Sequence, residues 1–281
     1  MTSAFPTEPP RVVASDLDGT LLRSDGTVSD RTRDALRRTE VAQIDVVFVT
    51  ARPPRWITPL VDAVAGHGVV IAGNGAFVVD ARTLEVTEEH GFSRLALLEL
   101  LGPLRREFPS AGLAVERSSG MTTERGYRSP HGHQLDSTEV DRLEDIDEVP
   151  TGKLLVMAPD GVGDGFQASV ERVVGELGHV SHSGVGRLAE ISAPGVTKAA
   201  GLARWCETRG VNAENVWAFG DMPNDLPMLR WAGTSFAVAN AHADVRATAG
   251  RTVPSNDEDG VAVTLEEMLT RGAGRPAGPH G

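Results

Sequence analysis

The chain has 281 residues, of which 40% are hydrophobic, and its formal net charge is −12. This length allows one large domain or two ordinary domains with packed cores. The negative charge argues against nucleic acid and anionic membranes as partners, because both require a cationic protein surface.

The single cysteine, Cys206, excludes an internal disulfide and favours a reducing compartment. The N-terminal segment MTSAFPTEPPR has no apolar run of signal-peptide length, and no stretch approaches the length needed to span a bilayer. We therefore expect a cytoplasmic protein that is a monomer or a small homo-oligomer. The glycine- and proline-rich tail, from about residue 271, is predicted to be disordered.

The first third of the chain alternates strand-like and helix-like patterns. Its near-continuous apolar runs are typical of strands buried on both faces, and the polar segments between them have helical spacing. The predicted order is βαβαβ, with strands at 11–16, 44–50 and 68–75 and helices at 30–40 and 56–66.

Between residues 82 and 186 the pattern changes to shorter apolar segments separated by loops rich in Ser, Arg, His and Gly, above all at 117–134. We expect an inserted α+β cap domain with its own small sheet. The predicted helices are 95–108 and 165–178, and the predicted strands are 112–117, 153–159, 179–183 and 187–192.

The last third returns to alternating strands and helices. The sequence therefore predicts an α/β fold in which residues 1–81 and 187–281 form one core with a Rossmann-like, doubly wound parallel sheet. The predicted strands of the last third are 215–219 and 234–239, and the predicted helices are 197–210, 224–233, 243–250 and 259–270.

Charged and small polar residues follow three of the core strands. Asp16 and Asp18 follow the first strand, residues 50–52 the second, and Asp221 follows the strand at 215–219. Because ligands of such sheets bind outside the carboxyl ends of the strands, we expect these residues to meet in one site.

Lys198 adds a cation to this site. It lies in the first turn of a predicted helix capped by Thr197, where the helix dipole disfavours positive charge. A residue selected for helix stability alone would more often be acidic there.

Two or three carboxylates at one sheet edge repel one another and need a compensating cation. Mg²⁺ fits, since it prefers oxygen ligands and commonly binds one or two carboxylates together with substrate phosphate. Asp16, Asp221 and a backbone carbonyl near Asp18 are the candidate ligands. One acid can then attack phosphorus while Asp18 transfers protons to and from the leaving group.

Four segments resemble the motifs of the haloacid dehalogenase superfamily of phosphatases, in its Cof-type branch with a large cap between the second and third motifs. The resemblance extends from about residue 11 to 269, and the middle section matches mainly in size and position. The four segments are DLDGTLL, VFVTAR, GVTKAAGL and FGDMPNDLPML.

The resemblance implies a role for each matching residue. Asp16 is implied as the nucleophile, Asp18 as the general acid and base, and Thr50 as a donor to the phosphate. Lys198 is implied to neutralise the phosphate and orient Asp16. The resemblance also implies Mg²⁺ ligation by Asp16, Asp221 and the Asp18 carbonyl, phosphate contacts from Asn224 and the amides of Leu17 and Ala51, and a supporting role for Asp225.

Several further residues leave two interpretations open. The Asn74–Gly75 pair indicates a tight turn and could also contact substrate, as could Arg52. Arg125 and Arg128 lie with Arg117 and Tyr127 in the most polar part of the cap, where substrate recognition and a solvated surface are both reasonable. The pairs His131/His133 and His179/His182 are more typical of solvated loops than of a transition-metal site.

The sequence thus predicts a Mg²⁺-dependent phosphomonoester hydrolase that forms an aspartyl-phosphate and acts on a small phosphorylated metabolite such as a sugar, polyol or vitamin-related phosphate. Two alternatives remain open. The same motifs serve phosphosugar mutases and phosphotransferases, and a protein without turnover could bind a phosphometabolite.

Overall fold

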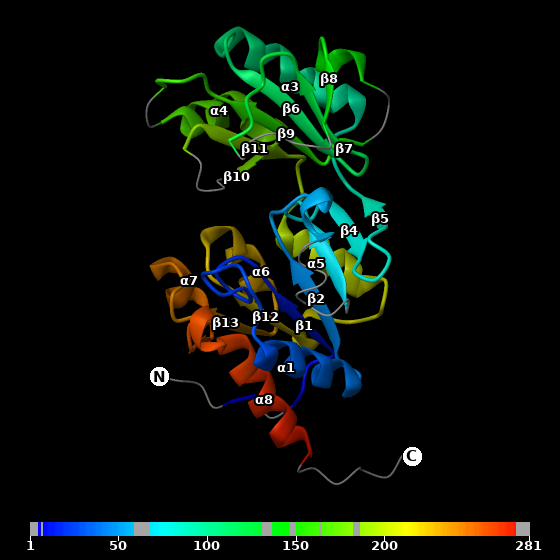
Figure 1. Cartoon of the computed structure of the whole chain (residues 1–281), viewed down its shortest axis with the longest axis vertical. Coiled ribbons are helices and arrows are strands. Elements are labelled where there is room, and N and C mark those ends of the chain that lie inside the picture. The colour runs from blue at the N-terminus through cyan, green and yellow to red at the C-terminus, as the bar shows by residue number, and fades with distance from the viewer. Residues whose placement is uncertain are drawn as a thin grey trace.

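The computed structural model describes residues 5–6, 8–58, 68–130, 137–146, 150–162, 165–181 and 186–273. Within these ranges the chain forms two units, which lie one above the other in Figure 1. We call them the core unit, built on an eight-stranded sheet, and the insert unit, built on a six-stranded sheet from residues 94–192. Most of the helix expected at 56–66 lies outside the described residues, and the short 3₁₀ turn η1 (Pro54–Trp56) precedes it.

The core sheet confirms the predicted doubly wound architecture. Its strand order is β14-β13-β12-β1-β2-β3-β4-β5, and all neighbours from β14 to β3 pair in parallel. The last two strands, β4 and β5, pair antiparallel and were not predicted. The strands are β1 (Val12–Ser15), β2 (Asp45–Val49), β3 (Val69–Ala72), β4 (Phe77–Asp80), β5 (Val86–Glu89), β12 (Val216–Gly220), β13 (Thr234–Val238) and β14 (Arg251–Val253).

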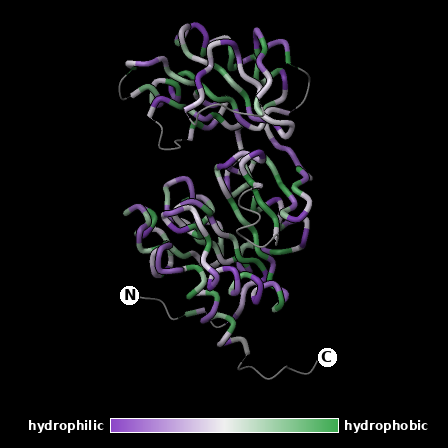
Figure 2. Tube along the Cα trace, in the orientation of Figure 1, coloured by the Kyte–Doolittle hydropathy of each residue, from purple (hydrophilic) through white to green (hydrophobic). Residues whose placement is uncertain are grey.

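Helices cover both faces of the core sheet, so its strands are buried on both sides. On β1, Val12 and Ala14 pack against α5, α6 and α7, whereas Val13 faces α1 and α8. Figure 2 shows the resulting hydrophobic strands inside a hydrophilic envelope. The helices are α1 (Asp30–Val41), α5 (Lys198–Glu207), α6 (Leu226–Trp231), α7 (Ala243–Thr248) and α8 (Gly260–Ala273).

The insert unit is an α+β layer, as predicted. Its strand order is β10-β11-β9-β6-β7-β8. Helices α3 (Arg94–Glu107) and α4 (Phe166–Val174) pack on one face, against residues such as Leu113 and Val156. The strands are β6 (Gly112–Arg117), β7 (Gly120–Glu124), β8 (Ser137–Val140), β9 (Lys153–Met157), β10 (His179–Ser181) and β11 (Leu188–Ser192).

The opposite face of the insert sheet carries every second residue of the same strands. Glu116, Lys153 and Glu190 lie on this face together with Leu155 and Leu188, and all five line a cavity shared with the core unit. The pleat of the insert sheet therefore turns two acids and a lysine toward the core.

The strand pairings also bear on the expected domain limits. Strand β5 lies beyond residue 82 yet pairs with the core sheet, and β11 lies beyond residue 187 yet pairs with the insert sheet. Polar β5 is a sheet edge and gives no apolar signal of a core strand. We therefore propose that the chain crosses between the units near residues 90–93 and 193–196.

The prediction of a loop over residues 117–134 is wrong in part. Residues 120–124 form β7, which pairs antiparallel with β6 across a tight turn. Its threonines and Met121 suit a strand, but polar residues on both sides hide the pattern.

Among the described helices, none combines the length and apolar character that crossing a bilayer requires.

Candidate active site

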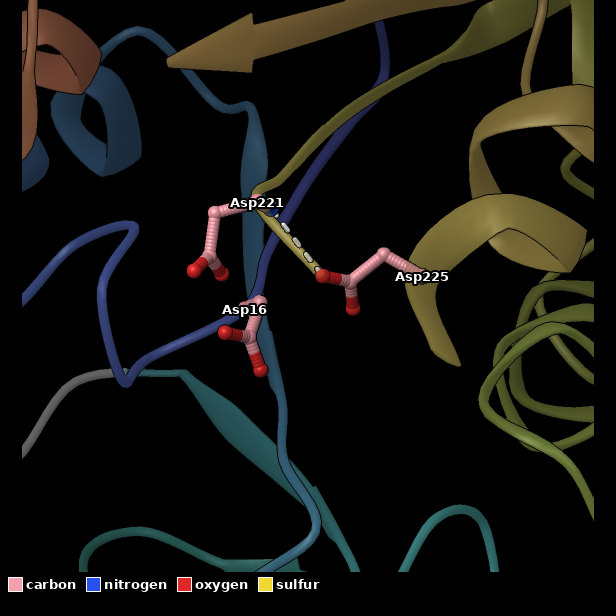
Figure 3. Close-up of side chains that lie close together, drawn as sticks. All are labelled: Asp16, Asp221 and Asp225. Carbon is pink, nitrogen blue, oxygen red and sulfur yellow. Dashed lines mark hydrogen bonds between the residues drawn. The ribbon is translucent and has the colours of Figure 1, made fainter. Parts of the chain in front are cut away.

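Three carboxylates meet at the carboxyl edge of the core sheet. Asp16 follows β1, Asp221 follows β12, and Asp225 lies in the 3₁₀ turn η5 (Pro223–Asp225) that leads into α6. One oxygen from each lies within 4.8 Å of the others, and Figure 3 shows the side chains converging. All three side chains are buried. The parallel pairing of β1 with β12 brings acids that are 205 positions apart in the chain into one cluster.

Lys198 supplies the positive charge of this cluster. Thr197 accepts a hydrogen bond from the Ala200 amide, as predicted for the cap of α5, and this fixes Lys198 as the first helical residue. Its Nζ donates to Asp16 Oδ1 at 2.5 Å and to Asp225 Oδ1 at 2.6 Å. The lysine thus holds two of the three acids.

Both carboxylate oxygens of Asp225 accept hydrogen bonds from neighbouring groups. Oδ1 accepts from Lys198, and Oδ2 accepts from the main-chain amides of Asp221 and Met222, each at 3.0 Å. The first of these amide bonds is the dashed line in Figure 3. Asp225 therefore orients Lys198 and Asp221, which fits the supporting role expected for it.

Burial and crowding perturb the ionisation of the cluster. Burial raises the pKa of Asp16 well above its ordinary value, and the neighbouring carboxylates of Asp225 and Asp221 add to this effect against the opposing charge of Lys198. Burial also raises the pKa of Asp221. Burial by itself lowers the pKa of Lys198, but Asp16 and Asp225 outweigh it and the net shift is upward, so the ammonium stays charged.

The donor set fits a hard divalent cation. One ammonium faces three buried carboxylates, so the cluster carries surplus negative charge, and carboxylate oxygens are the ligands such a cation prefers. Thr20 donates to Asp221 Oδ1 at 2.8 Å and fixes that carboxylate. Gly19, at φ +79°, leaves the space beside it open, since a Cβ there would lie 2.5 Å from Asp221 Oδ2.

The loop after β2 forms a second wall of the site. Thr50 is buried, and its Oγ1 accepts from the Arg52 amide at 3.1 Å. The Arg52 guanidinium donates to both oxygens of Asp18, at 2.5 and 2.8 Å, and this pairing is the main cause that raises the pKa of Arg52. Asp18 thus lies beside the acid cluster while its side chain is held by Arg52.

A cavity of about 760 Å³ lies above the cluster. The core unit contributes the predicted residues Asp16, Asp18, Ala51, Arg52, Lys198 and Asn224 to its lining. Leu17 is buried in the core by its side chain, and its carbonyl accepts from the amides of the following turn. The insert unit forms the opposite wall, so the cavity is closed on two sides by different parts of the chain.

Some candidate residues lie elsewhere. Asn74, at φ +58°, forms the predicted tight turn with Gly75, and its Nδ2 donates to Ser181 of the insert unit at 3.3 Å. Neither residue is part of the described lining of the cavity. The exposed Arg125 pairs with Glu139 and Asp141.

The remaining candidates of the cap divide between the cavity and the surface. Arg128 is exposed and Arg117 is half-buried, and the described lining includes neither. Tyr127 and His179 do line the cavity. The other three histidines of the two pairs, at positions 131, 133 and 182, lie outside the described residues.

Sequence patterns missed the ion pairs of the cavity. Arg55 donates to both oxygens of Glu116, at 3.0 and 2.5 Å, and so joins the core unit to β6. Lys153 donates to Glu190 at 2.5 Å and to the Ala51 carbonyl at 2.9 Å. One signal was available, because Lys153 and Lys198 are the only lysines in the sequence.

A family model described as haloacid dehalogenase-like hydrolase matches residues 13–265. The match covers both core segments and the insert between them. It includes each strand end that contributes to the acid cluster.

Characterised proteins and solved structures are similar over nearly the whole chain. The 5-amino-6-(5-phospho-D-ribitylamino)uracil phosphatase YitU of Bacillus subtilis is 29% identical, over 93% of this chain and 98% of that protein. The pyridoxal phosphate phosphatase YbhA of Escherichia coli is 29% identical, over 92% and 98%. The crystal structure of a haloacid dehalogenase-like hydrolase from Bacteroides thetaiotaomicron superposes with a TM-score of 0.74 at 27% identity, covering 93% of this chain and all of that one.

Proposed function

The chain belongs to the haloacid dehalogenase-like hydrolases and is a phosphatase, and from this premise we propose that it cleaves small phosphate monoesters through a phosphoryl group carried on Asp16. The observation that carries the proposal is the Lys198 bridge. It fixes the carboxylate of Asp16 within the acid cluster, at the edge of the cavity between the two units.

The first step forms a bond between Asp16 and phosphorus while the bond from phosphorus to the leaving oxygen breaks. Lys198 engages Asp16 Oδ1, and we assign the attack to Oδ2. Asp18, which takes up a proton once Arg52 no longer holds its carboxylate, gives this proton to the leaving oxygen. This requires Arg52 to release Asp18 when substrate binds, and the pair is exposed enough to separate, with side-chain exposures of 30% and 54%.

The second step returns the site to its starting state. Asp18, now ionised, takes a proton from water as the water oxygen bonds to phosphorus, and the bond to Asp16 breaks. The products are inorganic phosphate and free Asp16. Thr50, Asn224, Lys198 and the amides of Leu17 and Ala51 are proposed to hold the phosphate oxygens in both steps.

We propose Mg²⁺ as the divalent cation. Asp16, Asp221 and the Asp18 carbonyl would hold it, and a bound Mg²⁺ supplies positive charge that lets an anionic nucleophile approach an anionic phosphate. Thr20 and Asp225 hold Asp221 ready for this task.

We also propose that the insert unit acts as a cap over the site. It supplies one wall of the cavity and contacts the core through Arg55–Glu116 and Lys153–Ala51. Such a cap excludes bulk water during transfer and opens to exchange substrate and product. The relatives act on phosphorylated small molecules according to their names, and we propose the same broad class here.

Hydrolysis of an aryl phosphate tests the proposal. The wild type should release phosphate with Mg²⁺ and lose this activity with a chelator, and Asp16→Asn should lower the rate about 10³-fold or more. Asp34→Asn, at an exposed site on α1, is the matched control and should keep the rate. Equal rates for Asp16→Asn and wild type would overturn the mechanism, and an isomerised phosphosugar without free phosphate would indicate a mutase.

A further inference from the structure

The charged side chains of the cavity are already matched with one another. Four acidic and four basic side chains, apart from His179, occur among the described residues of the lining. Each of the four arginines and lysines is engaged by a carboxylate within the structure. What differs between the pairs is where they lie and how deeply they are buried.

Two of the pairs belong to the phosphate end of the cavity. Lys198 is held by Asp16 and Asp225, and Arg52 by Asp18. Arg52 follows Thr50 in the loop after β2, so a cation released there faces the phosphate being transferred. Both cations therefore serve the transferred phosphate, and neither is available to bind the rest of the substrate.

The other two pairs lie on the side of the insert unit, where the leaving group must fit. Arg55 and Glu116 form a bidentate pair with side-chain exposures of 10% and 5%. Lys153 and Glu190 pair with exposures of 2% and 12%, and Lys153 also donates to Ala51 O. A substrate anion could form an ion pair with Arg55 or Lys153 only by displacing the glutamate that holds it. The displaced glutamate would remain as an unpaired buried charge, which is strongly unfavourable.

The rest of this wall is apolar or neutral. Leu155 and Leu188 face the cavity together with the rings of Trp56 and Tyr127. The imidazole of His179, at an exposed position on β10, is the remaining basic group of the described lining. The carboxylates of Glu116 and Glu190 can accept hydrogen bonds from hydroxyl and amide groups of a leaving group. The apolar side chains can pack against its apolar or planar part.

We propose that the cavity selects phosphate monoesters whose leaving group is uncharged and rejects those with a second phosphate or a carboxylate. Selection comes from Glu116 and Glu190, which occupy the two buried cations and present their own negative charge to a second anion. This inference rests on the proposed function and adds the charge of the substrate to it.

A pair of aryl phosphates of equal size measures the selection. The probes are 4-(hydroxymethyl)phenyl phosphate and 4-carboxyphenyl phosphate, assayed for phosphate release with Mg²⁺ at about pH 8, where the carboxylate of the second probe is ionised. We expect the carboxylate to lower kcat/KM about tenfold or more, since like charges oppose each other in a buried site. A carboxylate does not slow departure of the phenol electronically, so the loss reports on the wall.

The variant Glu116→Gln makes the test specific. It releases Arg55 from its charged partner, and the ratio of the two kcat/KM values should move toward the carboxylate. Glu124→Gln is the matched control, because Glu124 is also buried, on β7, but pairs with Arg105 away from the cavity. Glu190→Gln, which releases Lys153, is the second variant if the first does not fold, as judged by its circular dichroism and melting.

The outcomes separate this inference from the proposed function. Equal or faster hydrolysis of the carboxylate by the wild type overturns the inference and leaves the phosphatase intact. An unchanged ratio in folded Glu116→Gln and Glu190→Gln also overturns it, since the paired acids would then not control selection. Absence of phosphate release from both probes overturns the proposed function and the inference together.

Discussion

Lys153 and Lys198, the only lysines in the sequence, line the same cavity from opposite units. Each has a side chain only 2% exposed, and each holds a carboxylate at 2.5 Å. Lysine is rarely buried unless it is paired, so these two side chains differ from ordinary surface lysines. The two ammonium groups provide separate tests, one of catalysis and one of the buried ion pair within the insert sheet.

Replacing Lys198 with Met should abolish most activity. The change leaves Asp16 and Asp225 without their cation and removes charge next to the phosphate. We expect kcat to fall about 10²–10³-fold, as for loss of one preorganised donor at a transition state. Steady-state phosphate release measures this, with Arg37→Met on the exposed face of α1 as the control. A variant that remains folded and keeps kcat within about threefold would contradict the assigned role.

Replacing Lys153 with Met should destabilise the protein, because Glu190 then remains as a buried charge. We expect a loss of about 3 kcal/mol in the free energy of unfolding, and recovery of most of it in the double variant Lys153→Met/Glu190→Leu. Urea unfolding of the wild type, both single variants and the double variant measures the coupling. Additive losses in the double variant would show that the pair contributes nothing as a pair.

Removing the Thr20 hydroxyl should weaken metal binding. Thr20 is fully buried, and its Oγ1 donates to Asp221 Oδ1 at 2.8 Å. In Thr20→Val the carboxylate loses this support, and we expect the Mg²⁺ concentration for half-maximal activity to rise about tenfold. Thr20→Ser keeps the hydroxyl and should stay near the wild type in the same titration. Coincident Mg²⁺ curves for the two variants would exclude the role.

Glu144 should make the free energy of unfolding depend on pH in the acid range. Burial opposes its ionisation, but hydrogen bonds from Arg142 and Arg105 outweigh burial and lower the pKa of Glu144 from 4.5 to about 2. A lowered pKa stabilises the folded state above pH 4.5, and this contribution disappears as the pH falls through about 2. Because the site is partly solvated, we expect Glu144→Gln to cost about 1 kcal/mol at neutral pH. Urea unfolding between neutral pH and the acid limit should show the two proteins converging, and a constant difference would contradict the pairing.

The acid cluster could be predicted from the sequence because its geometry follows from topology. Asp16 and Asp221 each follow an apolar strand, and the carboxyl ends of parallel strands meet at one edge. The Thr197 cap fixes Lys198 at the start of its helix by local rules alone. Local patterns and one packing rule were therefore enough for Asp16, Asp221 and Lys198, whereas the supporting role of Asp225 was implied only by the family resemblance.

The wall above the cluster could not be predicted in this way. The Arg55–Glu116 pair joins residues 61 positions apart in different units, and Lys153–Glu190 joins two strands of the insert sheet. No local pattern encodes such long-range pairing. Strand β7 was missed for a different reason, because the polar residues on both of its sides hide its strand pattern. The motifs were enough to propose the phosphate chemistry, whereas the proposed substrate selection depends on tertiary contacts.

Trapping the phosphoryl group on Asp16 during turnover would test the proposed mechanism at the nucleophile itself. The wild type is mixed with a radiolabelled substrate and Mg²⁺, quenched in acid during turnover, and digested for peptide mapping. We expect label on the peptide that contains Asp16, released by hydroxylamine as an acyl phosphate should be, and no label in Asp16→Asn. Label on another residue, or turnover with no labelled protein at any quench time, would contradict the mechanism.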